Sequence, residues 1–282
     1  MLLAPTAAQI RLTTIELAAQ TDDGMLLHVR VPRGQTISEA AILNGDETIP
    51  VEIASVPLPQ TQWVLVDSSD AMINFQSAVG SALDRFLRGG EQASGLIFFG
   101  RDLQILQPSE GNPEVADFLV RYTATAGEPA CLAPALNILN DTIRSYDRSW
   151  RILLITAGDF AQSNDCPPDT MPLSLPAPIE IITINDSVDP QLSELVDSNG
   201  GQTLTANLRT VEARINEVRT LWGQPSYALQ AELPSDWDAS QPLELRVSLS
   251  GGGEETLSIP LRDDYTRPIP PTPTAEATEI AL

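Results

Sequence analysis

Trp63-Val64-Leu65-Val66-Asp67-Ser68-Ser69-Asp70-Ala71-Met72 is the stretch of the 282-residue chain that decides the fold. Its first four residues are all apolar, which is typical of a strand buried on both faces of a parallel sheet. Polar residues follow at once, and in an open α/β sheet such residues lie at the carboxyl edge, where ligands bind. The stretch therefore predicts a buried strand that carries Asp67 and Ser69 to a binding edge.

Helical and strand patterns alternate along the chain after this stretch. The expected strands are residues 95–99, 103–106, 152–155, 179–184 and 202–205. The expected helices are residues 73–87, 113–122, 132–146, 191–197 and 208–222. Such alternation predicts an α/β fold with a doubly wound, mostly parallel sheet and helices on both of its faces.

Short strand patterns, separated by turn residues such as Asn44-Gly45, occur at both ends of the chain. The expected strands are residues 10–17, 25–31, 40–43, 48–53, 227–233, 243–249 and 256–261. Neither group alone makes a stable sheet, whereas the two together suffice for a β-sandwich. We therefore expect an α/β domain at residues 60–222, inserted in a β-sandwich formed by residues 10–58 and 225–262.

The two termini differ in composition from the rest of the chain. Residues 1–9 have the short apolar stretch and small residues of a signal-peptide remnant, with an ordinary chain terminus as the alternative. Residues 263–282 form a Pro/Thr-rich linker or tail. No apolar run is long enough to span a membrane. We expect any anchor to belong to a further segment downstream of the tail.

The chain is strongly acidic, with 38 acidic against 16 basic residues and a net charge of −22. A field of this sign repels phosphate backbones and anionic lipid surfaces, so nucleic acid is not an expected partner. The acidic excess indicates a well-solvated surface, and attraction of cations or basic partners is the alternative.

Catalytic signatures are lacking in the sequence. His28, the sole histidine, lies in an expected strand of the sandwich and is far along the chain from any candidate nucleophile. The sequence also has no phosphate-binding glycine loop, no dinucleotide fingerprint and no Cys/His cluster with metal-ligand spacing. We therefore expect a protein that is not an enzyme.

The Asp67-x-Ser69 pair after a buried strand, together with the order of elements over residues 61–222, resembles a von Willebrand factor A domain. This resemblance implies a metal-ion-dependent adhesion site, in which oxygens from three loops hold a hard divalent cation. Asp67 and Ser69 match two of the family's ligand positions. Ala71, Ala130 and Ala157 stand where the family has serine, threonine and aspartate.

The resemblance therefore implies a degenerate metal site. Because Mg²⁺ demands near-ideal geometry, we expect at most weak binding of Mg²⁺ or Mn²⁺ and no other cofactor. Asp70 and Asp159 are the carboxylates that could substitute for the missing ligands. In the alternative interpretation, Asp67 and Ser69 only bond neighbouring loop amides and cap the following helix.

The chain has two cysteines, Cys131 and Cys166. In the family's fold both would lie at the edge that carries Asp67, so the resemblance implies a disulfide, with two unrelated buried thiols as the alternative. Such a bridge would close a loop of about 36 residues and stabilise the fold by roughly 3 to 4 kcal/mol. It would also indicate an oxidising compartment.

By analogy with the family, we expect a non-enzymatic protein-binding or adhesion module, secreted or on the cell surface. Its loops at residues 67–72, 125–131 and 157–170 would meet a protein ligand that the sequence does not identify. The alternative is a cytoplasmic assembly factor of the same family that works with an ATPase partner.

Overall fold

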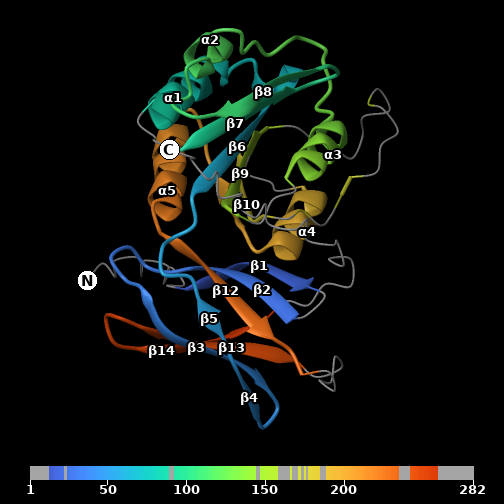
Figure 1. Ribbon diagram of the computed structural model, residues 1–282. Coiled ribbons are helices and arrows are strands. Elements are labelled where there is room, and N and C mark those ends of the chain that lie inside the picture. Colours follow the sequence, from blue (N-terminus) through green and yellow to red (C-terminus); the bar gives the residue numbers. More distant parts are fainter. Residues whose placement is uncertain are drawn as a thin grey trace, which may run out of the picture.

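A computed structural model describes residues 13–21, 24–88, 92–143, 147–157, 166, 171–172, 175, 177–184, 189–234 and 242–259. Within these ranges the chain forms an α/β part and a β-sandwich that lie end to end (Figure 1). The expected signal-peptide remnant at 1–9 and the tail at 263–282 lie outside the described residues. No described helix has the length and apolar character needed to cross a membrane.

The α/β part is built on one six-stranded sheet with the strand order β11-β10-β9-β6-β7-β8. All neighbouring strands are parallel except β7 and β8, which form an antiparallel pair. The strands are β6 (Gln60–Asp67), β7 (Ala93–Phe99), β8 (Leu103–Ser109), β9 (Ser149–Thr156), β10 (Ile179–Thr183) and β11 (Gln202–Thr205). The mostly parallel sheet predicted from the sequence is confirmed.

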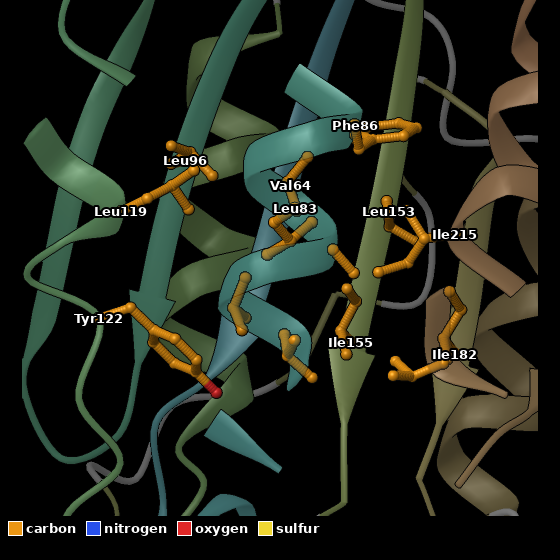
Figure 2. Close-up of a cluster of buried hydrophobic side chains, with 14 of the residues drawn as sticks. Val64, Leu83, Phe86, Leu96, Leu119, Tyr122, Leu153, Ile155, Ile182 and Ile215 are labelled. Carbon is orange, nitrogen blue, oxygen red and sulfur yellow. The ribbon is translucent and has the colours of Figure 1, made fainter. Parts of the chain in front are cut away.

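Helices cover both faces of this sheet. They are α1 (Gln76–Arg88), α2 (Val115–Leu119), α3 (Leu132–Thr142), α4 (Pro190–Asn199) and α5 (Val211–Trp222). Val64 and Val66 share a buried cluster with residues of α1, α2 and α5, whereas Trp63 and Leu65 share one with residues of α3 and α4. Figure 2 shows the first cluster, which includes Val64 of β6 and Leu83 of α1. An uninterrupted apolar run is therefore what this strand needs.

One glycine makes room for the largest side chain of the central strand. Trp63 is fully buried, and a Cβ at Gly95 of the neighbouring strand β7 would lie 2.4 Å from its ring. Because no real Cβ approaches a ring that closely, a side chain at position 95 would force the indole to move. Gly95 and Trp63 are thus a matched pair.

Several helices are shorter than their sequence patterns predicted. A 3-10 turn at Asp70–Met72 precedes α1, and α2 and α3 end before the expected residues 122 and 146. The expected start of α5 at residue 208 is wrong, because the Asn207 side chain accepts hydrogen bonds from the amides of Arg209 and Thr210. A turn of this kind gives these amides hydrogen-bond partners outside a helix, so α5 begins only at Val211.

The sandwich consists of two four-stranded sheets with the orders β1-β2-β12-β5 and β14-β13-β3-β4. Its strands are β1 (Thr14–Thr21), β2 (Gly24–Arg30), β3 (Ile37–Asn44), β4 (Glu47–Pro50), β5 (Glu52–Ile53), β12 (Ser226–Glu232), β13 (Leu243–Leu249) and β14 (Glu254–Ser258). Each sheet contains strands from both ends of the chain. The expected insertion of the α/β part into a sandwich is confirmed.

The single strand expected at residues 48–53 is wrong. The chain changes sheets there, so that β4 pairs in one sheet and β5 in the other. Ile49, Val51 and Ile53 all reach the sandwich core. Strands that switch sheets through a bend make the corners of a sandwich, and here the bend keeps the period-two pattern of a single strand.

The sandwich lies against the amino-terminal edge of the six-stranded sheet. Ser149, the first residue of β9, donates its backbone N–H to the carbonyl of Pro59 (2.9 Å) and its hydroxyl to Glu16 of β1 (3.1 Å). Asp67 and Thr156 end their strands at the other edge. The carboxyl edge of the sheet therefore faces away from the sandwich.

Candidate functional site

Asp67 is the last residue of β6 and is fully buried. Its Oδ1 accepts a hydrogen bond from the backbone N–H of Ser69 (2.8 Å). Its Oδ2 accepts from the hydroxyl of Thr156 (2.7 Å) and from the backbone N–H of Ala157 (3.3 Å). The carboxylate therefore ties the end of β6 to the end of β9 and to the loop that follows β6.

The side chain of Tyr122 hydrogen-bonds the backbone of Asp67. Its hydroxyl donates to the backbone carbonyl of Asp67 (2.9 Å), and its ring contacts Phe98 with the ring centroids 5.1 Å apart. Burial raises the pKa of the Tyr122 phenol, and the nearby negative charge of Asp67 raises it further. Tyr122 was missed from the sequence because it lies 55 residues from Asp67 in a segment without a motif.

Ser69 is buried beside Asp67, but its hydroxyl has a different environment. Among the residues that the structure describes, no group lies within hydrogen-bond reach of Ser69 Oγ. Ser69 precedes the 3-10 turn without capping it through its side chain. Of the two matched positions, only Asp67 hydrogen-bonds loop amides.

The residues at this edge do not fit the cation cage that the resemblance implies. Ala71, Ala130 and Ala157 supply no side-chain oxygen, and both oxygens of Asp67 already accept hydrogen bonds. In the described part of the chain, no group of three or more His, Cys, Asp or Glu side chains could hold a metal ion. Asp70 is exposed and binds a neighbouring loop, and Asp159 lies outside the described residues.

Three loops meet around the closed Asp67 carboxylate. The backbone N–H of Ser68 donates to the carbonyl of Phe99 (2.8 Å), and the N–H of Thr125 donates to the carbonyl of Ser68 (3.0 Å). The N–H of Asp70 donates to the carbonyl of Glu128 (3.0 Å). We call residues 68–73, 100–102 and 123–128 the rim.

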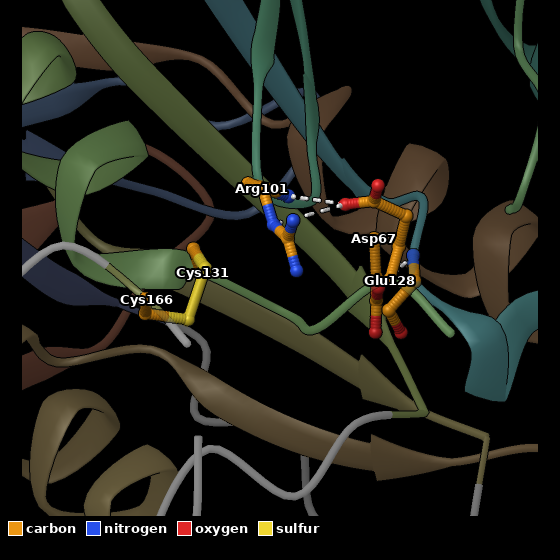
Figure 3. The surroundings of a disulfide bond; sticks show 6 residues. Asp67, Arg101, Glu128, Cys131 and Cys166 are labelled. Atoms are coloured by element: carbon orange, nitrogen blue, oxygen red, sulfur yellow. Dashed lines mark hydrogen bonds and ion pairs between the residues drawn. A yellow bond between two sulfur atoms is a disulfide. The ribbon is translucent and has the colours of Figure 1, made fainter. Parts of the chain in front are cut away.

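Side chains add to the backbone bonds within the rim. Asp70 Oδ1 accepts from the N–H of Gly127 (3.0 Å), and Gly127 has a φ of 75°, which favours glycine. Glu128 Oε2 accepts from the N–H of Arg101 (3.2 Å) and lies 4.0 Å from Arg101 Nε (Figure 3). A Cβ at Gly100 would lie 2.9 Å from the Ser68 hydroxyl. The three loops thus hold each other in one arrangement.

The rim presents a mixed set of side chains to solvent. Its exposed residues include two acids, one arginine and one large apolar side chain: Asp70, Asp102, Arg101 and Ile73. Ile73 is 40% exposed. The loops expected at 67–72 and 125–131 are brought together here, whereas most of the expected 157–170 loop lies outside the described residues. The turn at 100–102 was expected between two strands, but its place beside the other two loops was not expected.

A disulfide joins Cys131 and Cys166, with their Cα atoms 5.3 Å apart. Cys131 lies between the last rim loop and α3, and Cys166 comes from the connection after β9 (Figure 3). The bridge therefore links the segment that leads into α3 to the connection between β9 and β10. The disulfide implied by the resemblance is present.

Comparisons with known proteins identify the fold. No protein-family model matches the sequence, and no curated protein is significantly similar to it. A solved structure described as von Willebrand factor type A from Catenulispora acidiphila superimposes with a TM-score of 0.50 at 10% identity, covering 89% of this chain and 74% of that one. That share exceeds the α/β part and so includes strands of the sandwich.

Two further solved structures are similar at lower scores. The ArnB paralog VWA2 from Sulfolobus acidocaldarius gives a TM-score of 0.45 at 13% identity over 88% of this chain and 75% of that chain. The vWF domain of the type V pili tip protein Mfa5 from Porphyromonas gingivalis gives 0.46 at 11% identity over 60% of this chain and 96% of that chain. At such identities, similarity describes the fold alone.

Proposed function

We propose that this chain, whose α/β part has the von Willebrand factor A fold, is a non-enzymatic module that binds a protein partner through the rim without a bridging metal ion. The observation that carries the proposal is the mutual hydrogen bonding of the three rim loops around the buried Asp67. A surface that is already ordered loses little conformational freedom on binding, which favours its use in recognition. Loops held on a rigid sheet are the usual place for such contacts.

The partners of Asp67 support metal independence. Its carboxylate accepts two backbone N–H bonds and one hydroxyl bond, and hydrogen bonds to a charged acceptor contribute about 1.5 to 3 kcal/mol each. A cation at the lone pair that remains on Oδ1 would find no side-chain oxygen on the alanines at positions 71 and 157 to complete its coordination. Recognition then rests on the exposed rim side chains themselves.

The surroundings of the Ser69 hydroxyl support binding rather than catalysis. No described group lies within hydrogen-bond reach of the Ser69 hydroxyl, and a serine without an adjacent base is a poor nucleophile. His28 lies in β2 of the sandwich, at the other edge of the sheet, and both cysteines are paired. The residues near Asp67 therefore serve to shape a surface.

The disulfide supports an extracytoplasmic location, because such bonds persist mainly in oxidising compartments. That location favours the binding module over the assembly factor that works with an ATPase partner in the cytoplasm. We accordingly propose a secreted or cell-surface protein with a protein ligand.

A capture experiment with matched surface variants tests the function. The immobilised chain is exposed to a detergent extract of the surface of the source cells, and retained proteins are identified by mass spectrometry. We expect Ile73→Arg to abolish retention of the partner and Val56→Arg to leave it unchanged, since Val56 is 68% exposed but lies between β5 and β6 on the sandwich side. Equal retention by both variants, or equal loss, would contradict the proposal.

A further inference from the structure

Four charged side chains from four different strands meet between the sandwich and the six-stranded sheet. They are Glu16 of β1, Arg30 of β2, Arg151 of β9 and Glu180 of β10. Their side chains are 2%, 7%, 1% and 1% exposed, respectively. Two strands of the cluster belong to the sandwich and two to the α/β part, so the cluster joins the two parts.

Ion pairs run through the whole set. Arg30 Nε lies 3.4 Å from Glu16 Oε1, and Arg30 Nη1 lies 3.8 Å from Glu180 Oε1. Arg151 Nη1 pairs with Glu16 Oε1. The two positive and two negative charges balance, which is the condition under which buried charges can be tolerated.

Hydroxyl groups complete the surroundings of the Glu16 carboxylate. Its Oε2 accepts hydrogen bonds from the hydroxyls of Ser149 (3.1 Å) and Ser226 (2.7 Å). The Ser226 hydroxyl accepts in turn from Arg151 Nη2 (2.8 Å). Ser226 begins β12, so the network reaches the strand by which the chain re-enters the sandwich.

Glu180 holds the last helix of the α/β part at the point where the chain leaves it. Glu180 Oε2 accepts a hydrogen bond from the indole Nε1–H of Trp222 (2.9 Å), the final residue of α5. Trp222 is 2% exposed, and its ring centroid lies 5.6 Å from the ring centroid of Phe86 in α1. The cluster is therefore continuous with the packing of α1 and α5.

The two chain crossings between the parts lie side by side. The N–H of Leu58 donates to the carbonyl of Ser226 (2.7 Å), and Gln60 Nε2 donates to the carbonyl of Gln224 (2.9 Å). Because the two connections are adjacent, they would by themselves leave the two parts free to rotate about them. β1 and β2 are not part of these connections, so their contacts with the α/β part oppose such a rotation.

Buried ion pairs contribute little net stability, but separating the partners is strongly unfavourable because it leaves a charge buried alone. Desolvation lowers the pKa of Arg151 to about 10 and lowers that of Arg30, while Glu180 opposes both shifts. The cost of burying charge is thus largely offset only while all four partners keep their positions. An altered angle between the two parts would leave a charge buried without its partner.

We propose that the cluster of Glu16, Arg30, Arg151 and Glu180 is a joint that fixes the orientation of the α/β part, and with it the carboxyl edge of the sheet, relative to the sandwich. Its effect is on orientation more than on net stability. The carboxyl edge is then held at one angle relative to the sandwich.

Pulsed electron paramagnetic resonance on the full chain measures this orientation directly. Spin labels are attached to cysteines placed at two exposed positions, Glu194→Cys in α4 and Asp46→Cys in the turn before β4, without reducing the native disulfide. In the parent we expect one narrow distance distribution. In the charge-neutral double variant Glu16→Gln with Arg151→Met we expect the distribution to broaden at least twofold.

Two controls separate orientation from folding. Asp84→Asn, which breaks the exposed pair of Asp84 with Arg88, should leave the distribution as narrow as in the parent. Far-ultraviolet circular dichroism establishes that each variant is folded at the measuring temperature. If the double variant does not fold, the milder Glu180→Gln replaces it under the same criterion. A folded cluster variant with the parent's narrow distribution would overturn the proposal.

Discussion

The hydroxyl of Thr156 donates a hydrogen bond of 2.7 Å to the carboxylate of Asp67, and this contact joins two neighbouring strands at the carboxyl edge. Both residues are almost fully buried, at 1% and 0% exposed. The resemblance implied a degenerate metal site at this place, and in the structure the carboxylate accepts hydrogen bonds from three protein donors. The aspartate that would open a metal site thus acts as an anchor for the rim.

Thr156→Val tests the anchor. The variant keeps the shape of the side chain but removes a donor from a buried carboxylate, so we expect the free energy of unfolding to fall by about 1 to 3 kcal/mol. Urea denaturation followed by fluorescence measures the change. Thr205→Val, at the exposed end of β11, is the matched control and should change stability by less than about 0.5 kcal/mol. Equal effects of the two substitutions would refute a special role for the Thr156 hydroxyl.

Addition of Mg²⁺ or Mn²⁺ should leave thermal stability unchanged. A ligand that binds only the native state raises its stability in proportion to RT ln(1 + [L]/Kd), so even weak binding is visible at high concentration. Thermal melts at millimolar metal measure this, with Ca²⁺-free buffer and a chelator as the reference. A rise of several degrees that Asp67→Asn abolishes would show that the site binds metal despite its alanines.

The fold could be predicted from the sequence where one pattern has one structural meaning. The uninterrupted apolar run at 63–66 indicated a strand buried on both faces, and its two faces do pack on different helices. The period-two run at 48–53 had two meanings, because a bend at Val51 keeps the same side chains in the core while the strand changes sheets. Local pattern does not distinguish these cases.

The candidate site could be predicted only in part. The position of Asp67 followed from its strand, but its partners Thr156 and Tyr122 come from distant segments that are brought together by sheet order. The buried charge cluster left a signal that sequence reasoning did not use. Arg151 and Glu180 each stand inside or beside an otherwise apolar strand, and a charge there requires a partner.

Removal of the disulfide should destabilise the chain without changing its fold. The bridge spans a sequence separation of 35, for which the chain-entropy model gives roughly 3 to 4 kcal/mol. We expect the variant Cys131→Ala with Cys166→Ala to lose stability of this order in urea denaturation. Reduced parent protein, measured alongside, should resemble the variant. A thiol assay on the unfolded, unreduced parent should find no reactive thiol, and two reactive thiols would contradict the bridge.

Tyr122 should make the folded state sensitive to alkaline pH. Its pKa is raised above the ordinary value of 10.0 by burial and by Asp67, so the folded state keeps the proton at a pH where the unfolded state loses it. The stability that Tyr122 contributes is therefore fully present below pH 10 and is lost as the pH rises above it. Urea denaturation between pH 8 and about pH 11 measures the slope.

Tyr122→Phe isolates this contribution from other alkaline effects. The variant lacks the hydroxyl that donates to the carbonyl of Asp67, so we expect a loss of about 1 kcal/mol at neutral pH. Above pH 10 its stability should fall less steeply than that of the parent, because the unfolded variant has one fewer phenol to ionise. Absorbance titration of the folded parent should likewise leave one phenol protonated until the chain unfolds. Parallel pH profiles for parent and variant would mean that the Tyr122 phenol ionises as readily in the folded chain as in the unfolded one. That result would contradict the raised pKa of Tyr122.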